Sequence, residues 1–224
     1  MNRENLFSVD CLVNKGSSKE TAYLILHGYG ADFTDLAPLS DVLGGNPNGT
    51  WIFPNGFLTT QFGGRAWFPI DVAELERAMA TGVHRDLSQK RPQGMDQARQ
   101  RLMPLYEDLL KSHQKVVVGG FSQGAMMAME LALYGSKAPS GLVLFSGTLV
   151  DQGQWEQRLD KLDGVKIFQS HGTDDPLLAY EHAENLRNLM LSKDLDVQFV
   201  DFRGGHEIPQ KVISQAQSFL NQIN

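Results

Sequence analysis

Residues 120–124 read GFSQG, which places a serine between two glycines where the chain is expected to turn sharply. The preceding residues 115–119 (KVVVG) are typical of a buried strand, and residues 125–134 (AMMAMELALY) are rich in helix formers. A G-x-S-x-G segment between a strand and a helix holds its serine exposed on a strained turn, and the glycines let strand and helix approach closely. Ser122 is therefore the candidate nucleophile, although an ordinary Gly-Ser turn would have the same pattern.

A serine hydroxyl needs a neighbouring base to take its proton, and that base needs an acid to orient it. In a site of this strand–turn–helix type, the acid and then the histidine follow the serine along the chain. Three histidines follow Ser122. His206 lies in a glycine-rich loop after the last expected strand, His182 lies within a helical pattern, and the backbone of His171 is expected to shape a loop. His206 is the candidate base.

The acid is expected in the loop after the preceding strand, because ligand chemistry gathers at the carboxyl ends of parallel strands. That loop, residues 169–176 (QSHGTDDP), offers two adjacent carboxylates, Asp174 and Asp175. Consecutive side chains in a loop point in different directions, so one of the two should face His206. Glu207 is too close in sequence to His206 to orient it. Spacing leaves Asp174 and Asp175 as alternatives.

Attack on an acyl group also requires backbone N–H donors for the oxyanion that develops in the transition state. One donor should be the N–H of Gln123, which follows the nucleophile and begins a helix, where the helix dipole favours negative charge. The other should come from the loop after an early strand. Residues 26–32 (LHGYGAD) have the glycines for this approach, and His27 is better explained as part of this loop than as a base.

Short apolar runs alternate with helical patterns, which indicates a mostly parallel sheet with helices on both faces. Strands are expected at 21–26, 50–53, 115–119, 141–145, 165–169 and 197–202, with an antiparallel edge strand over 6–13. Helices are expected at 34–43, 95–112, 124–134, 180–191 and 209–222. With Ser122 at a strand-to-helix turn, this order predicts an α/β-hydrolase fold. The length of 224 residues favours a single domain over 1–224.

One stretch interrupts this alternation. Residues 54–94 contain several glycines, the aromatic pair Trp67 and Phe68, and a short helical pattern over 72–79. An irregular insertion of this length in a compact domain is usually functional, so it is a candidate cover for the site around Ser122. A simple surface excursion is the alternative.

Composition and charge narrow the classes of partner. The formal net charge of −6 argues against nucleic acid or an anionic membrane surface. No apolar run approaches the roughly 18 residues that span a bilayer, so integral membrane association is not expected. Cys11 is the single cysteine and the first residues lack a secretory apolar segment, so a reducing, cytoplasmic location is expected. No cysteine–histidine cluster is present, neither a metal nor a cofactor is expected, and the oligomeric state is left open.

In this order, the segments LHGYGAD, RAWF, GFSQG, HGTDDP and GGHEI resemble the phospholipase/carboxylesterase family, which includes the acyl-protein thioesterases. The resemblance implies that Asp175, the fifth residue of an HGxxD motif, is the acid, with Ser122 as nucleophile and His206 as base. It also implies that Tyr29, the residue after HG, donates the second N–H to the oxyanion, beside that of Gln123.

The resemblance extends from about residue 21 to the C-terminus. It implies that the RAWF segment at 65–68 lies near the substrate entrance, which makes Trp67 and Phe68 candidate substrate-binding residues, although aromatic pairs more often fill a core. This chain continues WFPID where many members read WFD or WYD. The preference for acyl chain length is therefore the property that transfers least.

Together these residues predict a serine hydrolase that cleaves carboxylic esters through an acyl-enzyme on Ser122. Acyl thioesters and lysophospholipids are candidate substrates. The alternative from another class is a non-catalytic binding protein on a hydrolase scaffold, which usually lacks one member of the catalytic triad. An acyltransferase that uses the same acyl-enzyme is a third hypothesis.

Overall fold

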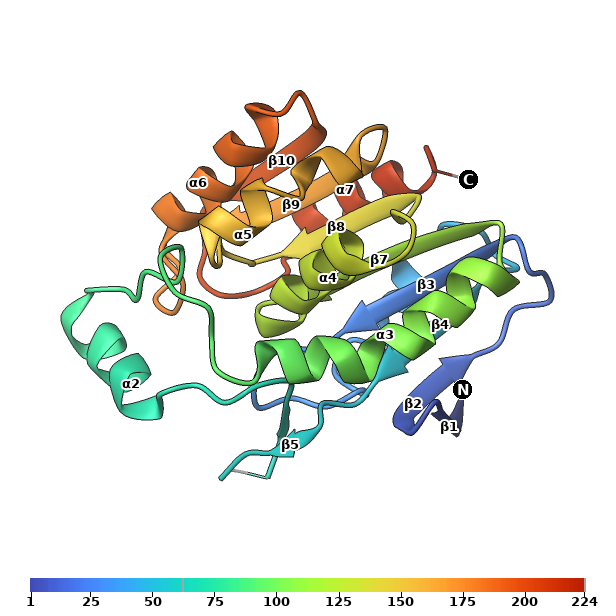
Figure 1. Cartoon of the computed structure of the whole chain (residues 1–224), viewed down its shortest axis with the longest axis horizontal. Coiled ribbons are helices and arrows are strands. Elements are labelled where there is room, and N and C mark those ends of the chain that lie inside the picture. The colour runs from blue at the N-terminus through green and yellow to red at the C-terminus, as the bar shows by residue number, and fades with distance from the viewer. Residues whose placement is uncertain (62, 224) are drawn as a thin grey trace.

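The computed structural model of the chain describes residues 1–61 and 63–223. Among these residues, the central sheet contains eight strands: β1 (Asn2–Leu6), β2 (Val9–Asn14), β3 (Thr21–Leu26), β4 (Thr50–Pro54), β7 (Lys115–Phe121), β8 (Gly141–Phe145), β9 (Lys166–Gly172) and β10 (Asp196–Phe202). They lie in the order β1-β2-β4-β3-β7-β8-β9-β10 (Figure 1). Neighbours from β4 to β10 pair in parallel, whereas β1 and β2 add an antiparallel edge.

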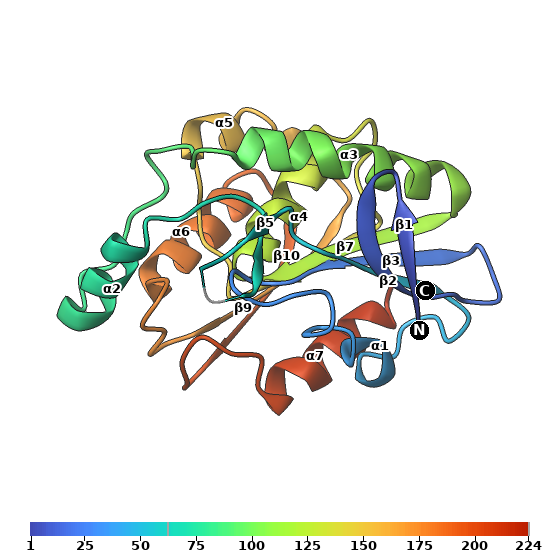
Figure 2. The same ribbon diagram turned by 90° about the horizontal axis from the view of Figure 1, so that it is seen from below.

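Helices cover both faces of this sheet. They are α1 (Leu39–Val42), α3 (Met95–Ser112), α4 (Gln123–Tyr134), α6 (Tyr180–Leu191) and α7 (Gln210–Leu220). Strand side chains alternate between the faces: Leu24 and Val118 pack with α3, α4 and α6, whereas Tyr23 and Val117 pack with α1 and α7. Figure 2 shows these two layers. The expected mostly parallel sheet with helices on both faces is confirmed. Within the described residues, no helix is both long enough and apolar enough to cross a membrane.

The N-terminal edge differs from the expectation of one strand over 6–13. The structure forms a hairpin instead, in which Leu6 of β1 pairs with Val9 of β2. The connecting residues Phe7 and Ser8 have φ angles of 52° and 65°. Positive φ at both central residues of a two-residue turn matches the twist of a hairpin. Because neither residue is glycine or asparagine, the sequence carried no signal for this turn.

The first helix is shorter than the expected range 34–43, because α1 begins only at Leu39. The side chain of Asp32 accepts hydrogen bonds from the backbone N–H and the hydroxyl of Thr34, which stabilises a turn in place of a helix. Pro38 lacks a backbone N–H and disfavours helical conformation in the residue before it. The helix therefore begins after Pro38.

The insertion at residues 54–94 is partly regular. Its described residues include the strand pair β5 (Leu58–Thr59) and β6 (Arg65–Ala66), and the helix α2 (Val72–Thr81) that the pattern predicted. Asp71 caps this helix by accepting a hydrogen bond from the backbone N–H of Glu74 at 3.0 Å. The helix α2 projects at the end of the sheet toward which the parallel strands run (Figure 1).

A buried carboxylate ties the insertion to the helical layer. Glu130 of α4 has no exposed side-chain surface, and its carboxylate accepts hydrogen bonds from Arg91 of the insertion (2.6 Å) and Arg99 of α3 (2.7 Å). It also accepts the indole N–H of Trp155 at 2.7 Å. Trp155 belongs to α5 (Gln152–Glu156), a short helix that the sequence pattern did not predict. One carboxylate therefore joins the insertion, α3, α4 and α5.

Glu130→Gln should lower the free energy of unfolding by about 3–5 kcal/mol, because it removes the fully buried carboxylate that two largely buried guanidinium groups share. Asp96 contacts the same two arginines, but its side chain is 47% exposed. Asp96→Asn should therefore cost no more than about 1 kcal/mol. Urea unfolding followed by circular dichroism measures both values. Equal losses in the two variants would contradict the central position of Glu130.

Candidate active site

Ser122 lies directly after β7 and immediately before α4. Its φ of 55° and ψ of −118° form a combination that residues other than glycine rarely adopt. The surrounding backbone holds it there: the N–H of Ser122 donates to the carbonyl oxygen of Phe145 (2.9 Å), and its own carbonyl accepts from Ala125 and Met126 (3.0 and 3.2 Å). The strained turn expected from the GFSQG segment is present.

The two glycines of this turn leave no room for a side chain. A Cβ atom on Gly120 would overlap the backbone of Gly124, and one on Gly124 would overlap the carbonyl oxygen of Leu26 on β3. Both obstacles are backbone atoms, which cannot move aside as the end of a flexible side chain can. The absence of side chains at these two positions therefore lets β3, β7 and α4 meet behind Ser122.

The structure brings His206 and Asp175 together. The Nδ1 atom of His206 lies 2.6 Å from Oδ2 of Asp175. The other carboxylate oxygen accepts hydrogen bonds from the backbone N–H groups of Leu177 (2.8 Å) and Leu178 (3.0 Å). Asp174, the alternative acid, is exposed to solvent, whereas the side chain of Asp175 is fully buried. Of the two adjacent carboxylates, it is Asp175 that meets the imidazole.

A second imidazole also contacts Asp175. The Nε2 atom of His171 lies 3.2 Å from Oδ2 of Asp175 and 2.9 Å from the carbonyl oxygen of Leu178. Since both neighbours are acceptors, Nε2 of His171 carries a hydrogen. Burial by itself raises the pKa of Asp175, but the hydrogen bonds from His171 and His206 outweigh it and hold this pKa well below its usual range. The carboxylate is therefore ionised at neutral pH.

The loop after β3 lies beside Ser122, since its residue Tyr29 lines the same cavity as Ser122 and Gln123. His27 stabilises this loop. Its Nδ1 donates to the neighbouring carbonyl oxygen (2.7 Å), and its Nε2 accepts the N–H of Gly56 in the insertion (2.9 Å). Burial lowers the pKa of His27 and keeps it neutral. His27 is therefore part of this loop, as expected from the sequence, and it also holds the loop against the insertion.

The side chain of Gln123 binds the segment that contains the two aromatic candidates. Its amide oxygen accepts the N–H of Trp67 (2.9 Å), and its amide nitrogen donates to the carbonyl oxygen of Phe68 (2.8 Å). Phe68 lines the cavity. Trp67 and Phe68 both pack in the core, but Trp67 is not among the residues that line the cavity, and its indole N–H donates to the carbonyl oxygen of His27 (2.8 Å). The structure thus separates the two aromatic residues, and only Phe68 belongs to the described cavity wall.

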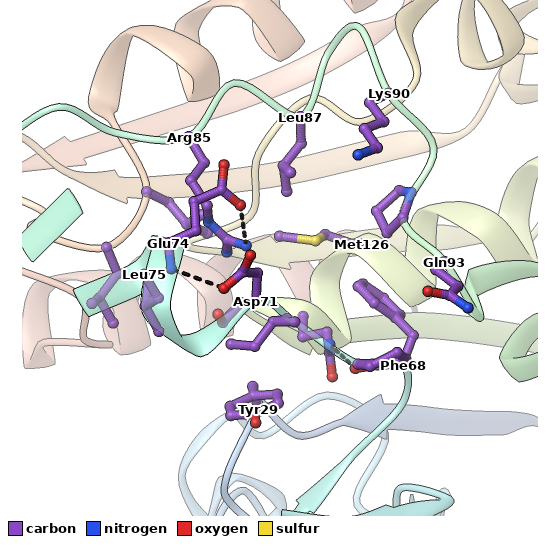
Figure 3. A pocket seen from close by; sticks show the side chains of 18 of the residues that line it. Tyr29, Phe68, Asp71, Glu74, Leu75, Arg85, Leu87, Lys90, Gln93 and Met126 are labelled. Carbon is purple, nitrogen blue, oxygen red and sulfur yellow. Dashed lines mark hydrogen bonds and ion pairs between the residues drawn. The ribbon is translucent and has the colours of Figure 1, made fainter. Parts of the chain in front are cut away.

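The cavity at Ser122 has a volume of about 530 Å³ and is also lined by His206. Figure 3 shows part of its wall. The insertion supplies much of its wall, including the apolar side chains of Phe68, Pro69, Ile70, Leu75, Leu87 and Pro92. The charged residues Asp71, Glu74, Arg85, Asp86 and Lys90 lie in the same wall. The insertion therefore lines the cavity that contains Ser122.

Sequence reasoning missed the contacts that hold the insertion beside the acid loop. The Nε2 atom of His84 lies 3.0 Å from the carbonyl oxygen of Asp175, across 91 residues of sequence. The N–H of Asp151 donates to the carbonyl oxygen of Leu87 at 3.0 Å. A contact across 91 residues leaves no local pattern, so His84 could not have been found from spacing. His171 lies only four residues before Asp175, but the sequence pattern indicated a role for its backbone and not for its imidazole.

A mostly parallel sheet with a strained serine between a central strand and the following helix defines the α/β-hydrolase fold. Solved structures agree. An esterase named PE8 has a TM-score of 0.76 at 24% identity, with 96% of this chain and 99% of that chain aligned. A carboxylesterase of Bacillus cereus has a TM-score of 0.75 at 19% identity, with 96% and 95% aligned. The fold expected from the sequence is confirmed.

The model of the phospholipase/carboxylesterase family matches residues 10–224. A relative named acyl-protein thioesterase 1, from Candida albicans, is 27% identical over 230 residues, which cover 93% of this chain and 94% of that protein. The chain belongs to the phospholipase/carboxylesterase family, as the resemblance of its motifs implied, and it is a hydrolase of carboxylic esters.

The depressed pKa of Asp175 predicts a pH-dependent contribution to stability. A carboxyl group whose pKa is lower in the folded than in the unfolded chain stabilises the fold above its unfolded pKa, about 4, and this stabilisation is lost as the pH falls toward the folded pKa. The loss of unfolding free energy in Asp175→Asn should therefore shrink between about pH 5 and about pH 3. Urea unfolding across this range measures it, with Asp174→Asn as the exposed neighbouring control. A loss that stays constant would contradict the assignment.

Proposed function

We propose that Ser122 is the nucleophile of this ester hydrolase, with His206 as its general base and Asp175 as the acid that orients His206. The proposal is carried by the 2.6 Å contact between Nδ1 of His206 and Oδ2 of Asp175, in a pair whose histidine lines the same cavity as Ser122. With Nδ1 donating to an ionised carboxylate, Nε2 of the imidazole accepts the serine proton.

The reaction proceeds in two halves. Nε2 of His206 takes the proton of Ser122 while the serine oxygen attacks the acyl carbon of the substrate. The same proton passes to the leaving alcohol or thiol as its bond to the acyl carbon breaks, and the acyl group remains esterified to Ser122. Water then gives a proton to His206 and attacks the acyl carbon. The proton returns to the serine oxygen as the carboxylic acid leaves.

Two backbone N–H groups, those of Tyr29 and Gln123, hold the oxyanion formed in each half. Gln123 is the first residue of α4, where N–H groups have no partner within the helix and the helix dipole favours negative charge. Tyr29 lines the same cavity, and its loop is anchored by the N–H of Gly30, which donates to the carbonyl oxygen of Arg65 at 2.8 Å. Donors fixed before the reaction need little reorganisation when charge develops.

The apolar side chains in the cavity wall indicate that the acyl group is the part of the substrate bound there. Leu75, Leu87, Met126 and Leu178 line it, and Figure 3 shows the first three of these side chains. Relatives named acyl-protein thioesterase extend the proposed substrates from oxygen esters to thioesters. Because candidates for nucleophile, base and acid are all present, catalysis explains the site better than a binding function alone.

We also propose a cytoplasmic location. Cys11 is the single cysteine of the chain, and burial raises the pKa of its thiol to about 12, so it is chemically inert. A chain that cannot form an internal disulfide is typical of a reducing compartment. The net charge of −6 favours a small ester over nucleic acid as the partner.

A fluorophosphonate probe should label the unaltered chain at Ser122 and should fail to label Ser122→Ala, because such probes react with an activated serine. Intact-mass spectrometry with peptide mapping identifies the labelled residue, and hydrolysis of 4-nitrophenyl butyrate is followed in parallel. Ser214→Ala, on the exposed face of α7, is the matched control and should be labelled normally. If the unaltered chain is neither labelled nor active, the non-catalytic alternative is favoured.

Asp175→Asn should lower kcat by up to about 10⁴-fold, because the imidazole loses the carboxylate that fixes its orientation and tautomer. Asp174→Asn, one residue away and exposed, should lower kcat far less. Steady-state kinetics on one ester measure both, with circular dichroism as a check of folding. A larger loss in Asp174→Asn would transfer the role of the acid to that residue.

A further inference from the structure

Arg85 differs from the other charged residues of the cavity wall because its guanidinium is nearly buried yet makes no hydrogen bond to the described residues. Its side chain is 11% exposed and lines the cavity that contains Ser122 (Figure 3). Its Nε atom is fully buried and has no partner in the part of the chain that the structure describes. Its ion-pair partner is Glu74, with Nη1 and Oε2 separated by 3.8 Å, which is too far for a hydrogen bond.

Unused donors of this kind indicate a missing partner. A guanidinium presents five N–H donors in a rigid planar fork, which matches the two oxygens of a carboxylate. Buried polar groups in folded proteins are almost always hydrogen-bonded, so an unsatisfied one calls for a ligand or an ordered water. Because Arg85 lines the cavity that contains Ser122, a substrate bound there can supply a partner to its guanidinium.

The acidic side chains near Arg85 leave its guanidinium free to bind a carboxylate of the substrate. Asp71 accepts a hydrogen bond from the backbone N–H of Glu74 (3.0 Å), and Asp86 accepts one from that of Ser88 (2.8 Å). Both carboxylates are therefore engaged with their own turns. The carboxylate of Glu74 is 49% exposed and held by one long contact, so it can turn into solvent at little cost. Figure 3 shows the ion pair of Glu74 and Arg85 as a dashed line within the cavity wall.

We propose that Arg85 binds a carboxylate of the substrate, so that the esters hydrolysed at Ser122 carry a negative charge. Glu74 occupies the position loosely in the free enzyme. The substrate carboxylate displaces it and makes the bidentate, charge-assisted contact that Glu74 does not make. The inference rests on the proposed function, since it names the substrate class of that same site. A monoester of a dicarboxylic acid, with an apolar chain between ester and carboxylate, fits both the apolar wall and the arginine.

The experiment compares matched substrates in each variant. The acyl arm pairs 4-nitrophenyl monoesters of succinic, glutaric and adipic acid with the 4-nitrophenyl esters of the neutral acids of equal chain length. The leaving-group arm pairs the butyrate ester of 4-hydroxybenzoate with that of its methyl ester. The readout is the ratio of kcat/KM for the charged substrate to kcat/KM for its neutral partner. Preference in one arm identifies which part of the substrate carries the carboxylate.

The two residues should move this ratio in opposite directions. Arg85→Gln should lower it by about tenfold or more, because a charge-assisted contact is lost. Glu74→Gln should raise it, because the competing carboxylate is gone. Lys90→Gln, which removes the same charge from an exposed residue of the same wall, should lower it less than Arg85→Gln does.

Two results would overturn the inference. A ratio that Arg85→Gln leaves unchanged would mean that the Glu74–Arg85 pair only holds α2 in place. Equal losses in Arg85→Gln and Lys90→Gln would mean that the cavity senses charge in general. In either case, continued Ser122-dependent hydrolysis of the neutral esters would leave the proposed function intact. Absence of hydrolysis in both arms, together with absence of probe labelling, would instead refute the proposed function itself.

Discussion

The close approach of β3, β7 and α4 at the serine turn is the constraint on which the site depends. The turn can close only because Gly120 and Gly124 have no side chains, and the positive φ of Ser122 (55°) is then imposed by backbone hydrogen bonds on both sides of it. Strain of this kind persists where the surrounding structure fixes the residue more strongly than the residue resists. The parallel sheet and the helices on its two faces supply that rigidity, so the proposed nucleophile is held by two largely buried elements, β7 and α4.

The carboxylate of Asp175 is the second fixed point, and it joins three separate parts of the chain. Its oxygens accept hydrogen bonds from His206 after β10, from His171 at the end of β9, and from the backbone N–H groups of Leu177 and Leu178. The carbonyl oxygen of the same residue contacts His84 of the insertion. A buried charge needs this many partners to remain ionised. The proposed acid is thus also the point where the insertion meets the loops after β9 and β10.

Local patterns in the sequence were sufficient for the central strands, the helices α3, α4, α6 and α7, and the serine turn, because burial leaves a periodic signal in contiguous residues. They could not decide between Asp174 and Asp175, since the choice depends on which carboxylate reaches the N–H groups of Leu177 and Leu178. They also gave no indication of Glu130, whose partners lie on three other segments. The sequence pattern places Glu130 within a helix, but only the folded structure shows that its side chain lies on a buried face of that helix.

The proposed catalytic residues and the residues that contact the substrate therefore lie on different parts of the molecule, and different contacts hold each part in place. The proposed nucleophile, base and acid are held by the sheet, whereas the charged and much of the apolar wall of the cavity comes from residues 68–93 of the insertion. A few named contacts fasten that segment, among them Arg91 to Glu130 and His84 to the acid loop. A change at Arg85 or Glu74 can alter which ester fits without disturbing the strained serine, because neither residue takes part in the packing that holds Ser122.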